Sequence, residues 1–176
     1  MSEHRRTLLR IFAIMAGAVL VLLVVLPAVY RSRMVGGEAP VIGDMRTMSS
    51  AQAAYAASNG EYYDRPACLA RPSGCLRGWD DTKPTFLDPG LAALGIRNGY
   101  ARFFHAGPPV ARQEIEARRL SPTSLRAFAY VARPLTAGAR TFCVDARGMV
   151  CDTLGSAGLM PDPKDGVCPA ECRPLH

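Results

Sequence analysis

The sequence predicts an α+β protein in which a long N-terminal transmembrane and stalk helix leads into a small antiparallel β-sheet head stabilised by disulfides. An unbroken apolar run and then an apolar pattern of helical spacing occupy the N-terminal third of the 176 residues. Short strand-like segments bounded by glycine and proline fill the C-terminal half. All six cysteines lie after the apolar run.

These patterns divide the chain into five segments. The residues after the apolar run are enough for one domain with a modest core. The segments are a cytoplasmic tail at 1–10, a transmembrane helix at 11–30, a stalk helix at 31–60, a globular α+β head at 61–153 and a Gly/Pro-rich tail with cysteines at 154–176.

The apolar run extends from Ile11 to Leu26 without a charged or polar side chain. Continued through Tyr30, it reaches the ~20 residues that a helix needs to cross a hydrocarbon core. A cleaved secretory signal would have a shorter apolar stretch and a small-x-small cleavage site, which this sequence lacks. A buried core helix is disfavoured because the run has no polar face. The pattern therefore favours a retained membrane helix.

The six cysteines predict both disulfides and the location of the head. An even number in a small domain rich in glycine and proline is typical of a disulfide framework, which persists in an oxidising compartment. We therefore expect the C-terminal domain to lie outside the cytoplasm. The cysteines are Cys68, Cys75, Cys143, Cys151, Cys168 and Cys172.

The charge of the chain does not indicate a nucleic-acid-binding protein. The net charge is +6, of which +4 remains after the three basic residues and one acidic residue that precede the apolar run. The arginines are scattered singly or in pairs, whereas nucleic-acid binding usually needs a clustered basic stripe. We expect no nucleic acid among the partners.

A helix with one buried face is predicted after Pro40. Its remaining positions are rich in alanine, and Asn59-Gly60 indicates its end because both residues tolerate the left-handed conformation. We interpret the apolar stripe as core packing rather than as a ligand site. The stripe consists of Val41, Met45, Met48, Gln52 and Tyr55.

The segment from Glu61 to Pro89 is predicted to be irregular. Asp80-Asp81 lacks a third carboxylate at the interval that a calcium loop needs, so a solvated turn is favoured over a calcium site. Asp88, as an N-cap before Pro89, predicts a short helix through Leu94.

Four strands are predicted beyond this point, while the charged segment 114–120 is either a loop or a short helix. The aromatic and alternating patterns that indicate strands are typical of half-buried sheets. The predicted strands are Tyr100 to His105, Ala127 to Arg133, Thr141 to Asp145 and Met149 to Thr153.

The last two predicted strands form a hairpin around Ala146-Arg147-Gly148, whose residues suit a type I turn with a glycine bulge. In that register Cys143 faces Cys151, which predicts a Cys143–Cys151 disulfide. Six cysteines allow fifteen connectivities. Cys168 and Cys172 bond either to each other or back onto the sheet, and we prefer nearest-neighbour pairing, including Cys68–Cys75.

Five stretches resemble type IV pilins and pseudopilins, and their order and spacing carry the resemblance. It implies a membrane-anchored, non-enzymatic structural or accessory subunit of a type IV pilus or type II secretion-type system. The alternative is a stand-alone, membrane-anchored extracytoplasmic binding module derived from the pilin fold. The stretches are LPAVYRSRM at 26–34, MRTMSSAQAAYAASNGEYY at 45–63, FLDPGLA at 86–92, NGYARF at 98–103 and ARTFCVDARGMV at 139–150.

The resemblance also implies a location and partners. We expect a single-pass protein of the bacterial inner (cytoplasmic) membrane with a periplasmic C-terminal domain. Its partners would be the membrane and other pilin-like subunits or secretion machinery proteins.

The N-terminus departs from the family pattern. Aligned from Pro27, Arg5 and Arg6 replace the glycine and phenylalanine of the family's processing site, so the site is degenerate. Arg10 replaces the family's glutamate, which is thought to meet a neighbour's free amino terminus, and its charge would repel that amine. We expect the chain to keep its N-terminus and not to form the repeating subunit of a filament.

We expect no catalytic residue, cofactor or metal. His4, His105 and His176 lie in the predicted tail, in a strand and at the last position. Cys168 and Cys172 with His176 have zinc-like spacing, but disulfides are favoured for cysteines in an oxidising compartment. The same argument disfavours a free catalytic thiol. No glycine-rich phosphate loop or G-x-S-x-G elbow occurs.

Overall fold

The computed structural model describes residues 15–17, 19–21, 23, 38–136, 138–153 and 160–175. The chain divides into two compact units, Met1–Gly37 and Glu38–His176, and each is described by itself. In the first unit, the described residues are helical and their large apolar side chains are exposed.

The predicted transmembrane helix is not found. No helix among the described residues is long and apolar enough to cross a membrane. Of 11–30, the structure describes 15–17, 19–21 and 23, all of which are helical. The predicted fold class is therefore wrong in its membrane-spanning helix, and the predicted single-pass location in an inner membrane is contradicted. The rest of 11–30 lies outside the described residues.

The second unit begins with a helix at 38–58. All five residues of the predicted stripe are fully buried, which confirms that this stripe is core. The helix ends before Gly60, whose φ is 61°, and the Glu61 N–H closes the end by donating to Ala56 O at 2.8 Å. A glycine suits this position because L side chains strain the left-handed region.

One antiparallel sheet follows, with five strands in the order β1-β2-β3-β4-β5. Each strand pairs with the next along the chain, so the sheet is a meander. The first four strands confirm the predicted segments to within two residues, whereas β5 was not predicted. The strands are β1 (Tyr100–Ala106), β2 (Phe128–Pro134), β3 (Thr141–Asp145), β4 (Val150–Thr153) and β5 (Arg173–Pro174).

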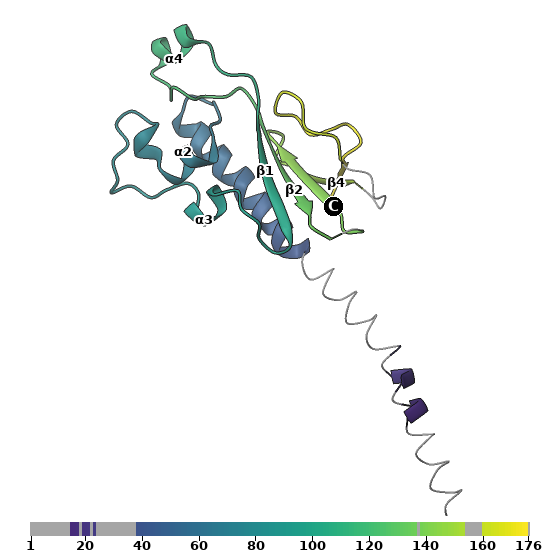
Figure 1. Ribbon diagram of the computed structural model, residues 1–176. Helices are drawn as coiled ribbons and strands as arrows, with labels where there is room; N and C mark the ends of the chain where they lie inside the picture. The colour runs from purple at the N-terminus through teal and green to yellow at the C-terminus, as the bar shows by residue number, and fades with distance from the viewer. Residues whose placement is uncertain are drawn as a thin grey trace, which may run out of the picture. The chain divides into compact units, whose positions relative to one another are not determined.

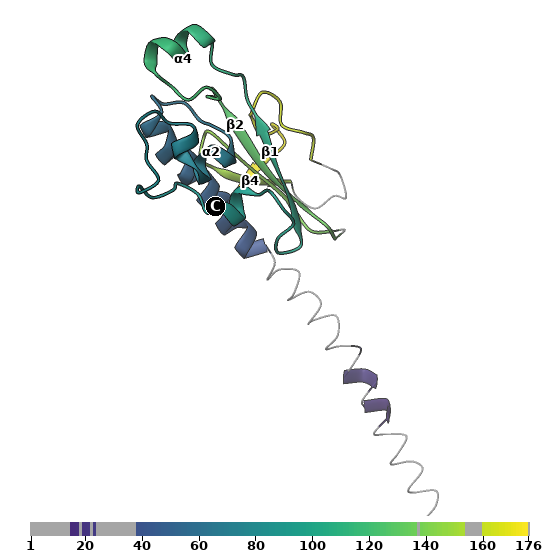
Figure 2. The same cartoon turned by 60° about the vertical axis from the view of Figure 1, so that its left-hand side comes forward.

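Short helices fill the connections (Figure 1), and α4 projects at the end of the unit opposite the start of helix 38–58 (Figure 2). The charged segment after β1 is thus a short helix rather than a loop. Asp88 caps α3 as predicted, because its Oδ1 accepts a hydrogen bond from Gly90 N at 2.8 Å. These helices are α2 (Pro66–Ala70), the 3₁₀ turn η1 (Pro72–Gly74), α3 (Pro89–Ala92) and α4 (Arg112–Arg118).

The sheet is covered on both faces. On one face, the stripe of helix 38–58 packs with Tyr130, Phe142 and neighbouring apolar residues of the sheet. On the other, Met160 and the tail cysteines pack against Ala129 and Val131. Since successive residues of a strand point to opposite faces, this double cover explains why every residue of β3 is buried.

The disulfides differ in part from the prediction. Cys68–Cys75 is confirmed, but the predicted Cys143–Cys151 and Cys168–Cys172 bonds are wrong. Cys143 bonds to Cys168 and Cys151 bonds to Cys172. The register prediction itself is confirmed, because Cys143 and Cys151 lie opposite each other. Both contribute to the cluster that the tail covers, so each cysteine of the hairpin bonds to the tail instead of to its neighbour.

Asp145 joins the β3–β4 turn to the tail. The carboxylate is buried and accepts hydrogen bonds from the Cys168 N–H at 3.0 Å and from the backbone and guanidinium of Arg147. The turn closes as predicted, with Gly148 N donating to Asp145 O at 2.9 Å. Burial raises the pKa of Asp145, but the hydrogen bonds from Arg147 and Cys168 outweigh it and hold the pKa below its usual value.

Acid should therefore weaken the fold through Asp145. A folded-state pKa below the unfolded value of about 3.9 gives stability that is present above that pH and is lost as the pH falls through the folded pKa. We expect Asp145→Asn to be less stable than the parent at pH 7 and to lose less of its free energy of unfolding below about pH 4. Urea unfolding at a series of pH values measures both; parallel curves for the two proteins would contradict the assignment.

A buried ion pair joins helix 38–58 to β1. Arg102 Nη2 lies 2.5 Å from Asp44 Oδ2, and the two side chains are only 2 % and 17 % exposed. Removing one partner of a buried pair leaves an uncompensated charge, at about 3–5 kcal/mol. Arg102→Ala should lower the free energy of unfolding by that amount, and Arg102→Met with Asp44→Leu should recover most of it. A double variant no more stable than Arg102→Ala would show that the ion pair is not the cause.

Candidate functional site

A buried carboxylate, Asp64, lies beyond the end of helix 38–58 and is fully enclosed. Tyr55 Oη donates to its Oδ2 at 3.0 Å, and Thr123 Oγ1 donates to its Oδ1 at 2.8 Å. The Arg65 N–H donates to Oδ1 at 2.8 Å. None of the ion pairs in the described part of the chain includes Asp64. Among the described residues, hydrogen bonds therefore hold this carboxyl group without a cationic partner.

Buried amides fix the backbone around this carboxylate. Gln52 Nε2 donates to Asp64 O at 2.6 Å, and the Asp64 N–H donates to Gln52 Oε1 at 3.2 Å. Asn59 Nδ2 donates to Ser124 Oγ at 2.9 Å, while its Oδ1 accepts from Ser121 N at 2.8 Å. The end of helix 38–58 is thus bonded both to the turn that follows it and to the segment before β2.

Tyr55 remains a neutral donor in this network. Burial, followed by the nearby charge of Asp64, raises the pKa of Tyr55 far above its ordinary value. Both effects disfavour the phenolate. The phenol therefore keeps its proton at neutral pH and donates it to Asp64.

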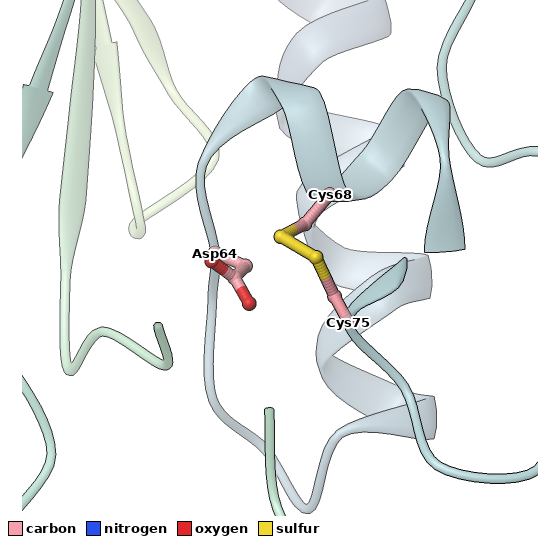
Figure 3. A group of neighbouring side chains, drawn as sticks. All are labelled: Asp64, Cys68 and Cys75. Carbon is pink, nitrogen blue, oxygen red and sulfur yellow. A yellow bond between two sulfur atoms is a disulfide. The ribbon is translucent and has the colours of Figure 1, made fainter. Parts of the chain in front are cut away.

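The Asp64 carboxylate also lies beside a disulfide (Figure 3). One oxygen of Asp64 and the sulfurs of Cys68 and Cys75 all lie within 4.8 Å of one another. Helix α2 begins at Pro66, two residues after this aspartate, and it carries Cys68, whose Sγ lies 3.5 Å from Thr123 Oγ1. Thiolates bind metals, but these sulfurs are bonded to each other. In its disulfide form the group is not a metal site.

All six cysteines named from the sequence form disulfides, whereas several other residues considered there cannot be placed. His4, His176 and the residues of the degenerate processing site, Arg5, Arg6 and Arg10, lie outside the described residues.

His105 is half-buried in β1. Its pKa is lowered by burial and by Arg133, against an opposing effect of Asp162. Cys168 and Cys172 belong to two different disulfides, so their zinc-like spacing does not provide a pair of thiolates.

Asp80-Asp81 forms an exposed turn, as favoured from the sequence. Asp80 accepts from the Thr82 N–H at 2.9 Å, and Asp81 accepts from Ser73 Oγ. The hydrogen bonds from Thr82 lower the pKa of Asp80. Each carboxylate thus accepts a hydrogen bond from a nearby residue of the same irregular segment.

Three large apolar side chains are exposed in or near β1 and β2. Ile96, Phe103 and Leu135 lie in or next to β1 and the end of β2, and all three are exposed. The Arg133 guanidinium lies 5.7 Å from the centre of the Phe103 ring. Leu135 N donates to Gly99 O, which extends the pairing of the two strands to this end.

Comparisons with known proteins give no further guide: no family model matches the chain, and no curated protein and no solved structure was found to match it.

Sequence reasoning missed the Asp64 network. The signal was the presence of Gln52 and Tyr55 in an otherwise apolar stripe, because buried polar groups require hydrogen-bond partners. The sequence alone does not identify Asp64 and Thr123 as those partners, since the contacts join segments far apart in the chain.

The network predicts different results for two tyrosine-to-phenylalanine substitutions. Tyr55 and Tyr130 are both fully buried, but the Tyr130 hydroxyl has no hydrogen-bond partner in the described structure. Tyr55→Phe removes a donor from a buried carboxylate and should lower the free energy of unfolding by about 1–3 kcal/mol. Tyr130→Phe should change it by far less or increase it. Equal effects in urea unfolding would contradict the role given to the Tyr55 hydroxyl.

Proposed function

We propose that the chain is a pilin-like, non-enzymatic structural or accessory subunit of a type IV pilus or a type II secretion-type system. The observation that carries the proposal is the packing of helix 38–58 along one face of the antiparallel meander that follows it in the chain. The resemblance of five stretches to pilins and pseudopilins implies this order of a helix and then a sheet head.

The arrangement of polar groups supports a role in contact rather than in chemistry. Asp64 and its partners Gln52 and Tyr55 are fully buried, as is Ser121, which bonds Asn59. Their hydrogen bonds join segments of the domain to one another. These hydrogen bonds therefore stabilise the head.

The exposed apolar side chains supply a surface for contact. Single exposed apolar residues are common, but Ile96, Phe103 and Leu135 all lie in or next to the neighbouring strands β1 and β2, with Phe103 in the middle of β1 opposite Val131. Such groups mark interaction sites more often than isolated residues do. We take other pilin-like subunits or secretion machinery proteins as the partners, and no nucleic acid.

Co-purification of the tagged full chain from its own cells, after chemical cross-linking, tests the proposal. We expect pilin-like subunits or secretion machinery proteins in the eluate, identified by mass spectrometry. Phe103→Ser with Leu135→Ser should lower their recovery severalfold, because it removes exposed apolar contacts without touching the buried core. Met149→Ser, at an equally exposed methionine beside the β3–β4 turn, is the matched control and should leave recovery unchanged.

Two outcomes would contradict the proposal. Recovery of the chain without any such protein would favour a stand-alone binding module. Equal recovery by the parent, the Phe103→Ser/Leu135→Ser double variant and Met149→Ser would show that the contact does not use Phe103 and Leu135.

A further inference from the structure

We propose that reduction of the Cys68–Cys75 disulfide converts Asp64, Cys68 and Cys75 into a binding site for a thiophilic divalent cation such as Zn²⁺. The ligand atoms of the three residues already lie within 4.8 Å of one another. The proposal concerns this group alone and does not rest on the pilin-like function.

The donor set suits zinc. Zn²⁺ binds cysteine sulfur at about 2.3 Å and carboxylate oxygen at about 2.0–2.2 Å, in a tetrahedral arrangement. Two sulfurs and one oxygen supply three ligands, and water supplies the fourth. Because the three ligand atoms are gathered before the metal arrives, side-chain rotations are enough to close the site.

Two hydroxyls orient the carboxylate. Tyr55 Oη and Thr123 Oγ1 hydrogen-bond the two oxygens of Asp64 and so orient it. Ligating carboxylates are usually held in this way. Buried charges in proteins are generally paired or bound to metals, and Asp64 has no cationic partner among the described residues. A bound cation would compensate this charge.

The redox step has a simple balance. A dithiol reductant gives two electrons and two protons; the Cys68–Cys75 bond breaks, two thiols form, and the reductant becomes a disulfide. The reductant can approach through Cys75, which is only partly buried, whereas Cys68 is buried. Zn²⁺ then displaces the two thiol protons. The metal closes the same loop that the disulfide closed.

Zinc titration of the full chain tests the proposal. The chain is treated with a dithiol, the reductant is removed under inert gas, and Zn²⁺ is added in competition with a chromophoric chelator. Alkylation of a parallel sample maps the open cysteines. We expect one equivalent of Zn²⁺ to bind to the reduced chain and none to the disulfide form. Co²⁺ in place of Zn²⁺ should give a thiolate charge-transfer band.

Three variants locate the site. Asp64→Asn should weaken Zn²⁺ binding at least tenfold, whereas Asp81→Asn, at an exposed carboxylate of the neighbouring turn, should leave it unchanged. Cys75→Ser should abolish the binding and the Co²⁺ band, and it decides the test if Asp64→Asn does not fold.

The proposal is overturned if the reduced chain binds no more Zn²⁺ than the disulfide form. Unchanged binding in Cys75→Ser, or in a folded Asp64→Asn, would also overturn it, because the metal would then lie on the cysteines of the sheet and tail.

Discussion

The central β-strands must be shielded from water on both faces, and the rest of the domain is arranged to provide this cover. All residues of β3 and the first five of β2 are buried, so neither face of the sheet centre can be left to solvent. An antiparallel sheet often has one wet face and an alternating pattern. Here two covers are needed, and they are built in different ways.

The two covers differ because their sequences differ. Helix 38–58 carries a stripe of large apolar side chains, and burial of that stripe holds it on the sheet. The tail is rich in glycine and proline, and of its described residues Met160 and the two cysteines are the ones that pack on this face. Two disulfides and the hydrogen bond from Cys168 N to Asp145 hold it instead. Covalent bonds thus replace hydrophobic packing where the sequence cannot supply it.

This difference explains which parts of the fold could be predicted. The helical stripe, the first four strands, the β3–β4 turn and Cys68–Cys75 all follow from local spacing, and local spacing predicted them. The tail pairing does not. Cys143 lies opposite Cys151 in the predicted register, but their bonds depend on which segment covers that face. The two residues of β5 give no periodic signal, and nothing local indicates that the tail returns to β4.

The predicted membrane helix rests on composition alone, and the described residues contain no helix that fits it. Composition can indicate that a segment is apolar enough to span a bilayer, but it does not establish that the segment does so. The candidate site, which is built from polar residues, could likewise be predicted only in part from the sequence. Gln52 in the stripe indicated a buried polar group, whereas the position of Asp64 depends on the fold of the turn and of the segment before β2.

The chemistry of Asp64 explains why a carboxylate, rather than its neutral amide, suits this position. The three groups that bond it, Tyr55 Oη, Thr123 Oγ1 and the Arg65 N–H, all act as donors. A carboxylate only accepts, whereas an asparagine would turn an NH₂ group toward at least one of these donors. The hydrogen bonds thus favour a group that only accepts, and this group lies beside the sulfurs of Cys68 and Cys75. The same acceptor that ties helix 38–58 to the segment before β2 therefore places a carboxyl oxygen beside the Cys68–Cys75 disulfide.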